Sequence, residues 1–409
     1  MPDNSVPLLT PQTLLNIAVL VAQHEASLWH DRTPSHISVL TGSQYVEELL
    51  SSRNPTRIFD VLRMPLPTFL TLRDWCIEHD YLRPTLHISV EEQLAIFLKI
   101  VGENASNRMA QERFQRSGST ISHVFNKVLD AIMMLYPTIV TQPNGDTIPS
   151  RIRNDPKMFP YFKGCIGAAD GTHIRSHIAE SDAVRFRSRK GEISQNVLGI
   201  CTFDELFCYV LPGWEGASHD TRVLQAALAA DLRTPPPGCY YLVDAGYGIR
   251  AGFLPPYRGV RYHLKEQYQS QQKPENKEEL FNLRHAQLRN IIERIFGILK
   301  RRFRILRTPP EYHFSTQVKL VFALTALHNF IRLNSDGTED NTRKRKWTDV
   351  ENEDVSQQSV GMDSVGNEPL GERFERTDID GAKEMSQLRE RIAENMWRDY
   401  NLYLDRQRR

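Results

Sequence analysis

Four acidic residues lie at positions where a purely structural role is a poor explanation for a carboxylate: Asp170, Asp220, Asp244 and Glu293. Asp170 and Asp244 each stand in an apolar, strand-like run, where an ionised side chain is unfavourable unless a cation or a set of donors compensates it. Carboxylate oxygens are the ligands that Mg²⁺ and Mn²⁺ prefer. Acids carried on two strand ends, a helix start and a facing helix therefore predict a site for one or two such ions. Ions held in this way could activate a water and stabilise the leaving oxygen of a phosphodiester.

Simpler interpretations exist for two of these acids. Asp220 immediately precedes a helical sequence, so it could be the N-cap of that helix. Glu293 is the one acid among seven bases in RNIIERIFGILKRRFRILR, and it could serve only as an ion-pair partner of Arg289 or Lys300. Position in the sequence leaves both readings open, although the presence of four such acids favours metal binding.

The bases of this helix predict a wall that holds DNA phosphates beside the metal site. Gly297, one turn after Glu293, predicts open space beside the carboxylate. We expect Lys300 and Arg304 to share the face of Glu293 by helical periodicity, and Arg302 to matter less. The residues predicted to contact DNA from this wall are Arg294, Lys300, Arg301 and Arg304.

Apolar runs of strand length frame the acids. Residues 164–178, 196–211 and 239–248 predict strands, and the sequence TRVLQAALAADL between the last two predicts a helix. A polar, loop-like insertion at 266–279 precedes the long basic helix. Strands followed by a helix, a strand and a terminal helix indicate an α/β domain with a mixed sheet, over 161–335.

An all-α domain is predicted over 61–150. Ser89 and Glu92 have the spacing of a capping box before the apolar helix QLAIFLKIV. Two further helices, NRMAQERFQ and STISHVFNKVLDAIMML, are joined by a short turn, which is the arrangement of a helix-turn-helix. The last helix would offer His123, Asn126 and Lys127 to DNA, although bundles of this shape also serve as packing modules. The shared core would come from Phe114, Ile121, Val124, Phe125, Val128 and Leu129.

Composition sets broad limits on the class of protein. The 409 residues are 40% hydrophobic and 25% charged, as in soluble globular proteins. Five cysteines without a C-x-x-C pair argue against a zinc ribbon or a disulfide framework. The apolar run at 14–22 is too short to span a bilayer, so no membrane partner is expected. Residues 336–409 carry 13 basic against 18 acidic residues, a net charge of −5; residues 1–335 then carry 38 against 32, or +6, which favours a polyanionic partner.

The ends of the chain carry less information. Residues 1–60 predict one or two helices with no recognisable chemistry. Residues 336–382 are acidic, rich in Ser and Gly and poor in aromatic residues, which predicts a disordered linker before a final helix at 383–409. The run RKRK at 343–346 predicts a nuclear localisation signal and hence a nuclear protein, although such a run could instead only keep the tail soluble.

The motifs of the chain, taken in order, resemble those of a known family. GAADGTHI, GASHDTRVL, YYLVDAGYG, RYHLKE, FNLRHAQLRNIIERIFGILKRRFRIL and ALHNFIR resemble the motif series of the PIF/Harbinger transposases and the Harbinger transposase-derived nucleases, over about 161–332. The segment from SVEEQLAIFL to RFQRSGSTISHVFNKVL resembles the helical segment that precedes the nuclease in this family.

The resemblance implies an RNase H-like fold and a DDE site that uses Mg²⁺ or Mn²⁺. Carried onto matching positions, it makes Asp170, Asp244 and Glu293 catalytic metal ligands, with Asp220 as a further ligand. It also implies cleavage and transfer of DNA strands, a homo-oligomer on DNA and a Myb-like DNA-binding helper protein. Two alternatives remain: a domesticated nuclease that does not transpose, and a catalytically silent DNA- or protein-binding factor, which we would expect to lack one of the acids.

Overall fold

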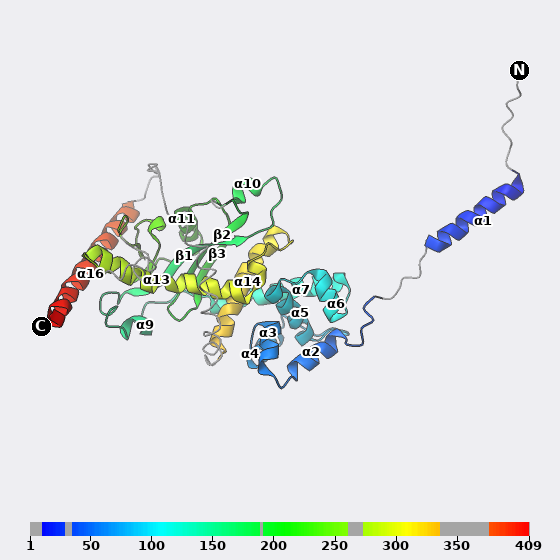
Figure 1. Ribbon diagram of the computed structural model, residues 1–409, viewed down its shortest axis with the longest axis horizontal. Coiled ribbons are helices and arrows are strands. Elements are labelled where there is room, and N and C mark those ends of the chain that lie inside the picture. Colours follow the sequence, from blue (N-terminus) through cyan, green and yellow to red (C-terminus); the bar gives the residue numbers. More distant parts are fainter. Residues whose placement is uncertain (1–9, 29–34, 189–190, 261–272, 336–375, 409) are drawn as a thin grey trace, which may run out of the picture.

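A computed structural model describes residues 10–28, 35–188, 191–260, 273–335 and 376–408 of the chain (Figure 1). Its centre is a five-stranded mixed sheet with helices packed on it, and a bundle of helices from the N-terminal part of the chain lies beside this sheet (Figure 1). The predicted RNase H-like α/β domain, preceded by an all-α part, is therefore confirmed. The part of the predicted disordered linker from 336 to 375 lies outside the described residues. This part includes the basic run at 343–346.

The strands lie in the order β3-β2-β1-β4-β5. β1 pairs antiparallel with β2 and parallel with β4, while β2 and β3 are antiparallel and β4 and β5 are parallel. The mixed sheet is as predicted, although β5 was not predicted. The strands are β1 (Cys165–Arg175), β2 (Ser194–Cys201), β3 (Phe207–Glu215), β4 (Tyr240–Leu242) and β5 (Phe253–Leu254).

The segment 196–211 forms a hairpin, so the prediction of one continuous strand is wrong. The chain turns between Cys201 and Phe207, and Glu205 in this turn has a φ of 60°, in the left-handed region that strands do not use. The residues on both sides of the turn are buried. Because buried strands are apolar on both faces, both strands have the same apolar character, and only Asp204 and Glu205 mark the turn between them.

Helices cover the two faces of the sheet. α11 (Asp220–Ala230) packs on one face, and α13 (Lys277–Arg302) and α14 (Phe314–Leu333) pack on the other (Figure 1). Phe296 of α13 lies over Gly199 of β2, where an added Cβ would come within 2.5 Å of the ring. The absence of a side chain at Gly199 therefore allows α13 to lie close to the sheet.

α5 (Val90–Glu103) is the central helix of the bundle and contacts the five helices around it. Ser89 caps it by accepting a hydrogen bond from the Glu92 amide at 3.2 Å. The other half of the predicted capping box does not form, because the fully buried Glu92 carboxylate instead pairs with Arg116 at 2.9 Å. All six residues predicted for the shared core are buried. The surrounding helices are α2 (Gly42–Leu50), α3 (Pro55–Leu62), α4 (Leu66–Glu78), α6 (Asn107–Phe114) and α7 (Gly118–Met133).

The bundle contacts the sheet domain directly through α7 and α14. The Phe125 ring of α7 stacks on Tyr312 with centroids 4.9 Å apart. Lys319 of α14 donates to Asp130 of α7 at 2.8 Å. One side of α7 is therefore occupied by packing, and only the other side is available to a partner.

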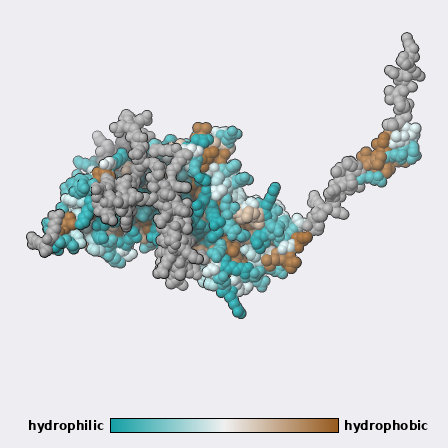
Figure 2. Space-filling model, viewed as in Figure 1, coloured by the Kyte–Doolittle hydropathy of each residue, from teal (hydrophilic) through white to brown (hydrophobic). Residues whose placement is uncertain are grey.

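The two terminal helices differ in how they pack. α1 (Pro11–Leu28) extends away from the rest of the protein and exposes apolar side chains such as Leu14 and Leu20 (Figures 1 and 2). α16 (Arg376–Arg408) begins seven residues before the expected start at 383 and packs along α13 and β5. Among the described residues, no helix combines the length and the apolar character that a membrane span requires. The short elements are α8 (Tyr136–Ile139), α9 (Ser150–Arg153), α10 (Ala183–Phe186), η1 (Ala245–Tyr247) and η2 (Arg304–Leu306).

Candidate active site

Asp170 and Asp244 lie at equivalent points of two neighbouring parallel strands. Ala168 of β1 pairs with Leu242 of β4, and each aspartate follows two residues later. Asp244 lies just beyond the carboxyl end of β4, where its side chain accepts from the Gly246 amide at 3.3 Å. Ends of parallel strands are where sheet-based active sites gather. The strand pairing thus brings two of the four predicted acids side by side.

Arg289 links Asp170 to the third acid, Glu293. Its Nη1 donates to Asp170 Oδ2 at 2.6 Å and its Nη2 donates to Glu293 Oε1 at 2.5 Å. The side chains of Arg289 and Asp170 are 10% and 17% exposed, whereas that of Glu293 is 51% exposed. Glu293 is therefore an ion-pair partner of Arg289, as the simpler reading expected, and the same guanidinium holds it near β1.

Asp220 is the first residue of α11, and the N-cap is His219. The reading of Asp220 as an N-cap is therefore wrong. Its Oδ1 accepts from Asn196 Nδ2 of β2 at 3.0 Å. The same oxygen would lie 2.6 Å from a Cβ added at Gly171, the residue after Asp170, so Asp220 lies directly against β1.

The four acids influence one another electrostatically. The pKa of Asp170 is raised to about 7, mainly by burial; the Arg289 guanidinium acts to lower it, and the carboxylates of Asp244, Glu293 and Asp220 contribute to the rise. One arginine thus offsets only part of the negative charge gathered at this place. A divalent cation is the kind of partner that such a group of carboxylates accommodates.

The arrangement is not ready to hold a metal ion as it stands. Within the described ranges, no group of three or more His, Cys, Asp and Glu side chains is placed to hold one. The predicted convergence of three carboxyl groups on one point is therefore not formed. The donors nevertheless have the right chemistry, and the Arg289 cation lies between the carboxylates of Asp170 and Glu293.

Two members of the predicted phosphate wall have partners inside the protein. Arg294 pairs with Glu205 at 3.2 Å. Lys300 donates to Thr172 Oγ1 at 2.7 Å and to the His173 carbonyl at 2.8 Å, and burial lowers its pKa to about 8. Lys300 therefore links α13 to β1 by hydrogen bonds. The charge pattern of the sequence did not indicate this structural role.

The rest of the wall also differs from expectation. α13 ends at Arg302 and Arg304 lies in η2, so the expectation that Arg304 shares a helical face with Glu293 is wrong. The Arg301 guanidinium lies 3.4 Å from the position of an added Cβ at Gly297, so the predicted open space beside this glycine is occupied. Arg302 is buried and Arg304 is exposed. Of these arginines, Arg304 offers the most accessible charge.

The residues predicted to face DNA from the helical bundle lie on α7. His123 and Asn126 are exposed, and Asn126 Nδ2 donates to the Ser122 carbonyl at 2.9 Å. Lys127 is half-buried, with its Nζ 3.5 Å from the Arg83 carbonyl. These positions permit contact with DNA, which stays a prediction.

Three polar residues that organise the site were not predicted. Asn196 holds Asp220, Thr172 accepts from Lys300, and Thr221 Oγ1 donates to the Gly246 carbonyl at 3.0 Å. A polar Asn at the start of the apolar run NVLGIC was the available signal for the first. The contact of Arg289 with Asp170 spans 119 residues, a separation that carries no local pattern.

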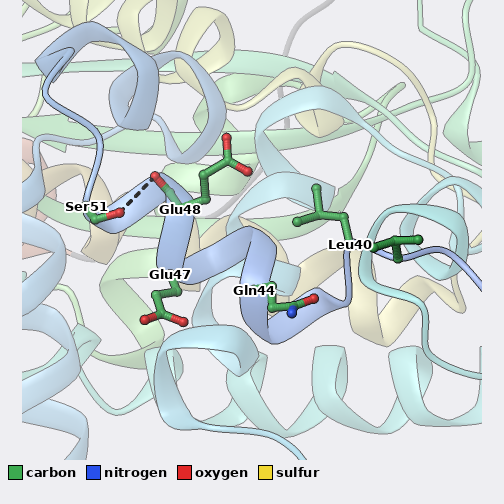
Figure 3. A pocket seen from close by; sticks show the side chains of 6 residues that line it. Leu40, Gln44, Glu47, Glu48 and Ser51 are labelled. Carbon is green, nitrogen blue, oxygen red and sulfur yellow. Dashed lines mark hydrogen bonds between the residues drawn. The ribbon is translucent and has the colours of Figure 1, made fainter.

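A shallow groove on the helical bundle is lined by residues of α2 and of the segment before it (Figure 3). None of the four acids lines it, so the groove is separate from the candidate active site. Its lining residues are Val39, Leu40, Gln44, Glu47, Glu48 and Ser51.

Comparison with known proteins agrees with this geometry. Residues 169–329, which contain all four acids, match a family model described as DDE superfamily endonuclease, and residues 37–134 match one described as a domain of unknown function. Proteins named "Putative nuclease HARBI1" from Bos taurus and Homo sapiens are each 22% identical over 256 residues, covering 60% of this chain and 69% of the relative. No solved structure matches the chain. Residues 169–329 therefore form a DDE superfamily endonuclease domain, and the chain is a distant homologue of the Harbinger-derived nucleases.

Proposed function

We propose that this protein is a metal-dependent DNA nuclease that cuts phosphodiester bonds and transfers DNA strands in the manner of PIF/Harbinger transposases. The observation that carries the proposal is the pairing of β1 with β4 inside the endonuclease domain, which sets Asp170 beside Asp244 below α13. The net charge of +6 over residues 1–335 suits a polyanionic substrate such as DNA.

Asp170, Asp244 and Glu293 would hold the divalent ions, with Asp220 as a further ligand. When bound, Mg²⁺ or Mn²⁺ activates a water or a 3′-hydroxyl and stabilises the leaving oxygen. The protein contributes rigidity on one side of the site, because strand pairing fixes the positions of Asp170 and Asp244 and Asn196 orients Asp220. On the other side, the Glu293 side chain on α13 is half-exposed and so accessible to solvent.

The first prediction is that each of Asp170→Asn, Asp244→Asn and Glu293→Gln abolishes nicking of supercoiled DNA with Mg²⁺ or Mn²⁺. Loss of one ligand disrupts ion geometry, while removal of one charge relieves repulsion, so the fold should persist. Plasmid nicking gives the activity and thermal melting without metal reports the fold.

Asp74→Asn is the matched control, since Asp74 is an exposed acid on α4, paired with Arg73 and remote from the site. This variant should nick as well as the unaltered protein. Full activity in any of the three site variants would contradict the assignment of that acid.

A catalytically silent DNA- or protein-binding factor is the second candidate function, and one observation favours it. The Arg289 bridge occupies carboxylate oxygens that metal ions would need. The nicking assay separates the two candidates, because a silent factor nicks no faster than its own Asp170→Asn variant. A domesticated nuclease would nick DNA but lack terminal inverted repeats beside its gene.

We also propose DNA-bound homo-oligomers, a Myb-like DNA-binding helper protein and a nuclear location. These proposals rest on the family resemblance and, for the location, on the basic run at 343–346. Gel shifts with differently sized versions of the chain would test the oligomer, since mixed complexes of intermediate mobility are expected only if copies assemble on DNA. Co-purification with a Myb-like protein would test the helper.

A further inference from the structure

Arg289 is a mostly buried cation enclosed between two acids of the candidate site. It reaches Asp170 on β1 and Glu293 on its own helix through separate guanidinium nitrogens, at 2.6 and 2.5 Å. The side chains of Arg289 and Asp170 are 10% and 17% exposed, so little water screens the contact between them, whereas Glu293 remains half-exposed. Each contact joins a cation to a carboxylate, and such charge-assisted hydrogen bonds are roughly twice as strong as neutral ones.

These contacts compete with metal coordination for the same atoms. Asp170 Oδ2 accepts from Arg289 and Oδ1 accepts from the Gly171 amide at 2.8 Å, so both oxygens already have a hydrogen-bond donor. Hydrogen bonding to Arg289 draws on the lone pairs that a divalent ion would use. A guanidinium within hydrogen-bonding distance of a ligand would also repel an ion held by that ligand.

We propose that Arg289 is the built-in counter-ion of the metal-free site and gives up its bonds to Asp170 and Glu293 when divalent ions bind. The inference rests on the proposed function, since it concerns the same four acids. It makes Arg289 a positioning residue that holds α13 against β1 before the metal arrives. It also explains how the four acids can lie close enough to repel one another before any ion binds, because the Arg289 cation offsets part of that repulsion.

The test compares Mn²⁺ binding to the full chain, carrying either Arg289 or Arg289→Met, by titration calorimetry without DNA. Methionine keeps much of the side-chain length and removes the charge and the donors. We expect Arg289→Met to bind Mn²⁺ more tightly by roughly tenfold or more, because the competing charged hydrogen bonds are gone. We also expect it to melt at a lower temperature without metal and to recover most of that loss with saturating Mn²⁺.

Arg289→Lys provides a second variant should the methionine variant fail to fold. A lysine keeps the charge but lacks the planar fork that spans two carboxylates, so its Mn²⁺ affinity should lie between the other two. Arg284→Met is the matched control, because this arginine is also on α13 but donates to Gln287 at 3.1 Å, outside the four acids. It should leave Mn²⁺ affinity unchanged.

The outcomes separate this inference from the proposed function. Equal or weaker Mn²⁺ binding in the Arg289 variants, with normal binding by the unaltered protein, overturns the counter-ion role and leaves the nuclease proposal standing. Weaker binding would mean that Arg289 is a fixed support that orients the ligands. Absence of Mn²⁺ binding from the unaltered protein and from both variants overturns the metal site itself, and the inference with it.

Discussion

Glu92 and Arg116 show what one buried charge requires of its neighbours. The Glu92 carboxylate is fully buried in the helical bundle, and Arg116 reaches it through two nitrogens, at 2.9 and 3.0 Å. Arg116 also donates to the His87 carbonyl at 2.6 Å. A buried pair of this kind adds little net stability, but removing one partner leaves an uncompensated charge in the core.

We therefore predict that Arg116→Met lowers the free energy of unfolding by about 3–5 kcal/mol. The comparison is Arg57→Met, which removes an arginine that pairs at the surface with Glu48, both partly exposed. Breaking such an exposed pair should cost at most about 1 kcal/mol. Urea unfolding measures both values, and similar losses in the two variants would show that Glu92 finds another partner or becomes protonated.

At the scale of elements, the closeness of α13 to the sheet decides whether Glu293 stands near Asp170. Asp170 pairs in register with Gly199 of β2, and the Phe296 ring of α13 covers that glycine. The helix therefore crosses the sheet at the residue opposite the first aspartate. A larger residue at Gly199 would push the helix, and with it Glu293, away from β1.

We predict that Gly199→Ala costs about 1–3 kcal/mol of stability, because its Cβ would lie 2.5 Å from the Phe296 ring. Phe296→Leu removes the clash, so the double variant should lose less than the sum of the single losses. Urea unfolding of the three proteins gives this coupling. Gly297→Ala on the same helix should be neutral or stabilising, since its Cβ meets Arg301 at an ordinary 3.4 Å. Additive losses would exclude the Gly199–Phe296 contact as the cause.

At the scale of the whole molecule, the endonuclease domain is held by elements from both ends of the chain. The helical bundle packs on α14 through α7, and α16 packs along α13. Glu390 of α16 accepts from Tyr257 at 2.8 Å, and Asp399 accepts from Tyr161 at 2.8 Å. The helix that carries Glu293 is thus supported by the C-terminal helix.

The location of the whole protein is predicted from the basic run at 343–346. A reporter too large to diffuse through nuclear pores, fused to residues 336–350, should accumulate in the nucleus, because a short basic run suits an acidic receptor groove. The same fusion with 343–346 replaced by alanines should remain cytoplasmic. If both fusions remained in the cytoplasm, the basic run would not be a nuclear localisation signal and would only help to keep the tail soluble.

The sequence determined the parts whose signals are local. Hydrophobic periodicity gave the three helices α5, α6 and α7 of the bundle and six of its buried residues, and the apolar runs before Asp170 and Asp244 gave their strands. Periodicity indicates which face of an element is buried, and a window of roughly a dozen residues is enough to recognise it. It failed at 196–211 because strands buried on both faces show no alternation through their turn.

Tertiary structure alone decided which charges meet. Three contacts could not be predicted from the spacing of residues along the chain. They are the bonds of Arg289 to Asp170, of Lys300 to Thr172 and of Arg294 to Glu205. Strand register and the height of α13 above the sheet set these distances, and both depend on packing between segments far apart in the chain. The composition of a basic helix predicts a DNA-binding surface. The directions of its side chains, however, depend on which carboxylates and carbonyls the fold brings within reach.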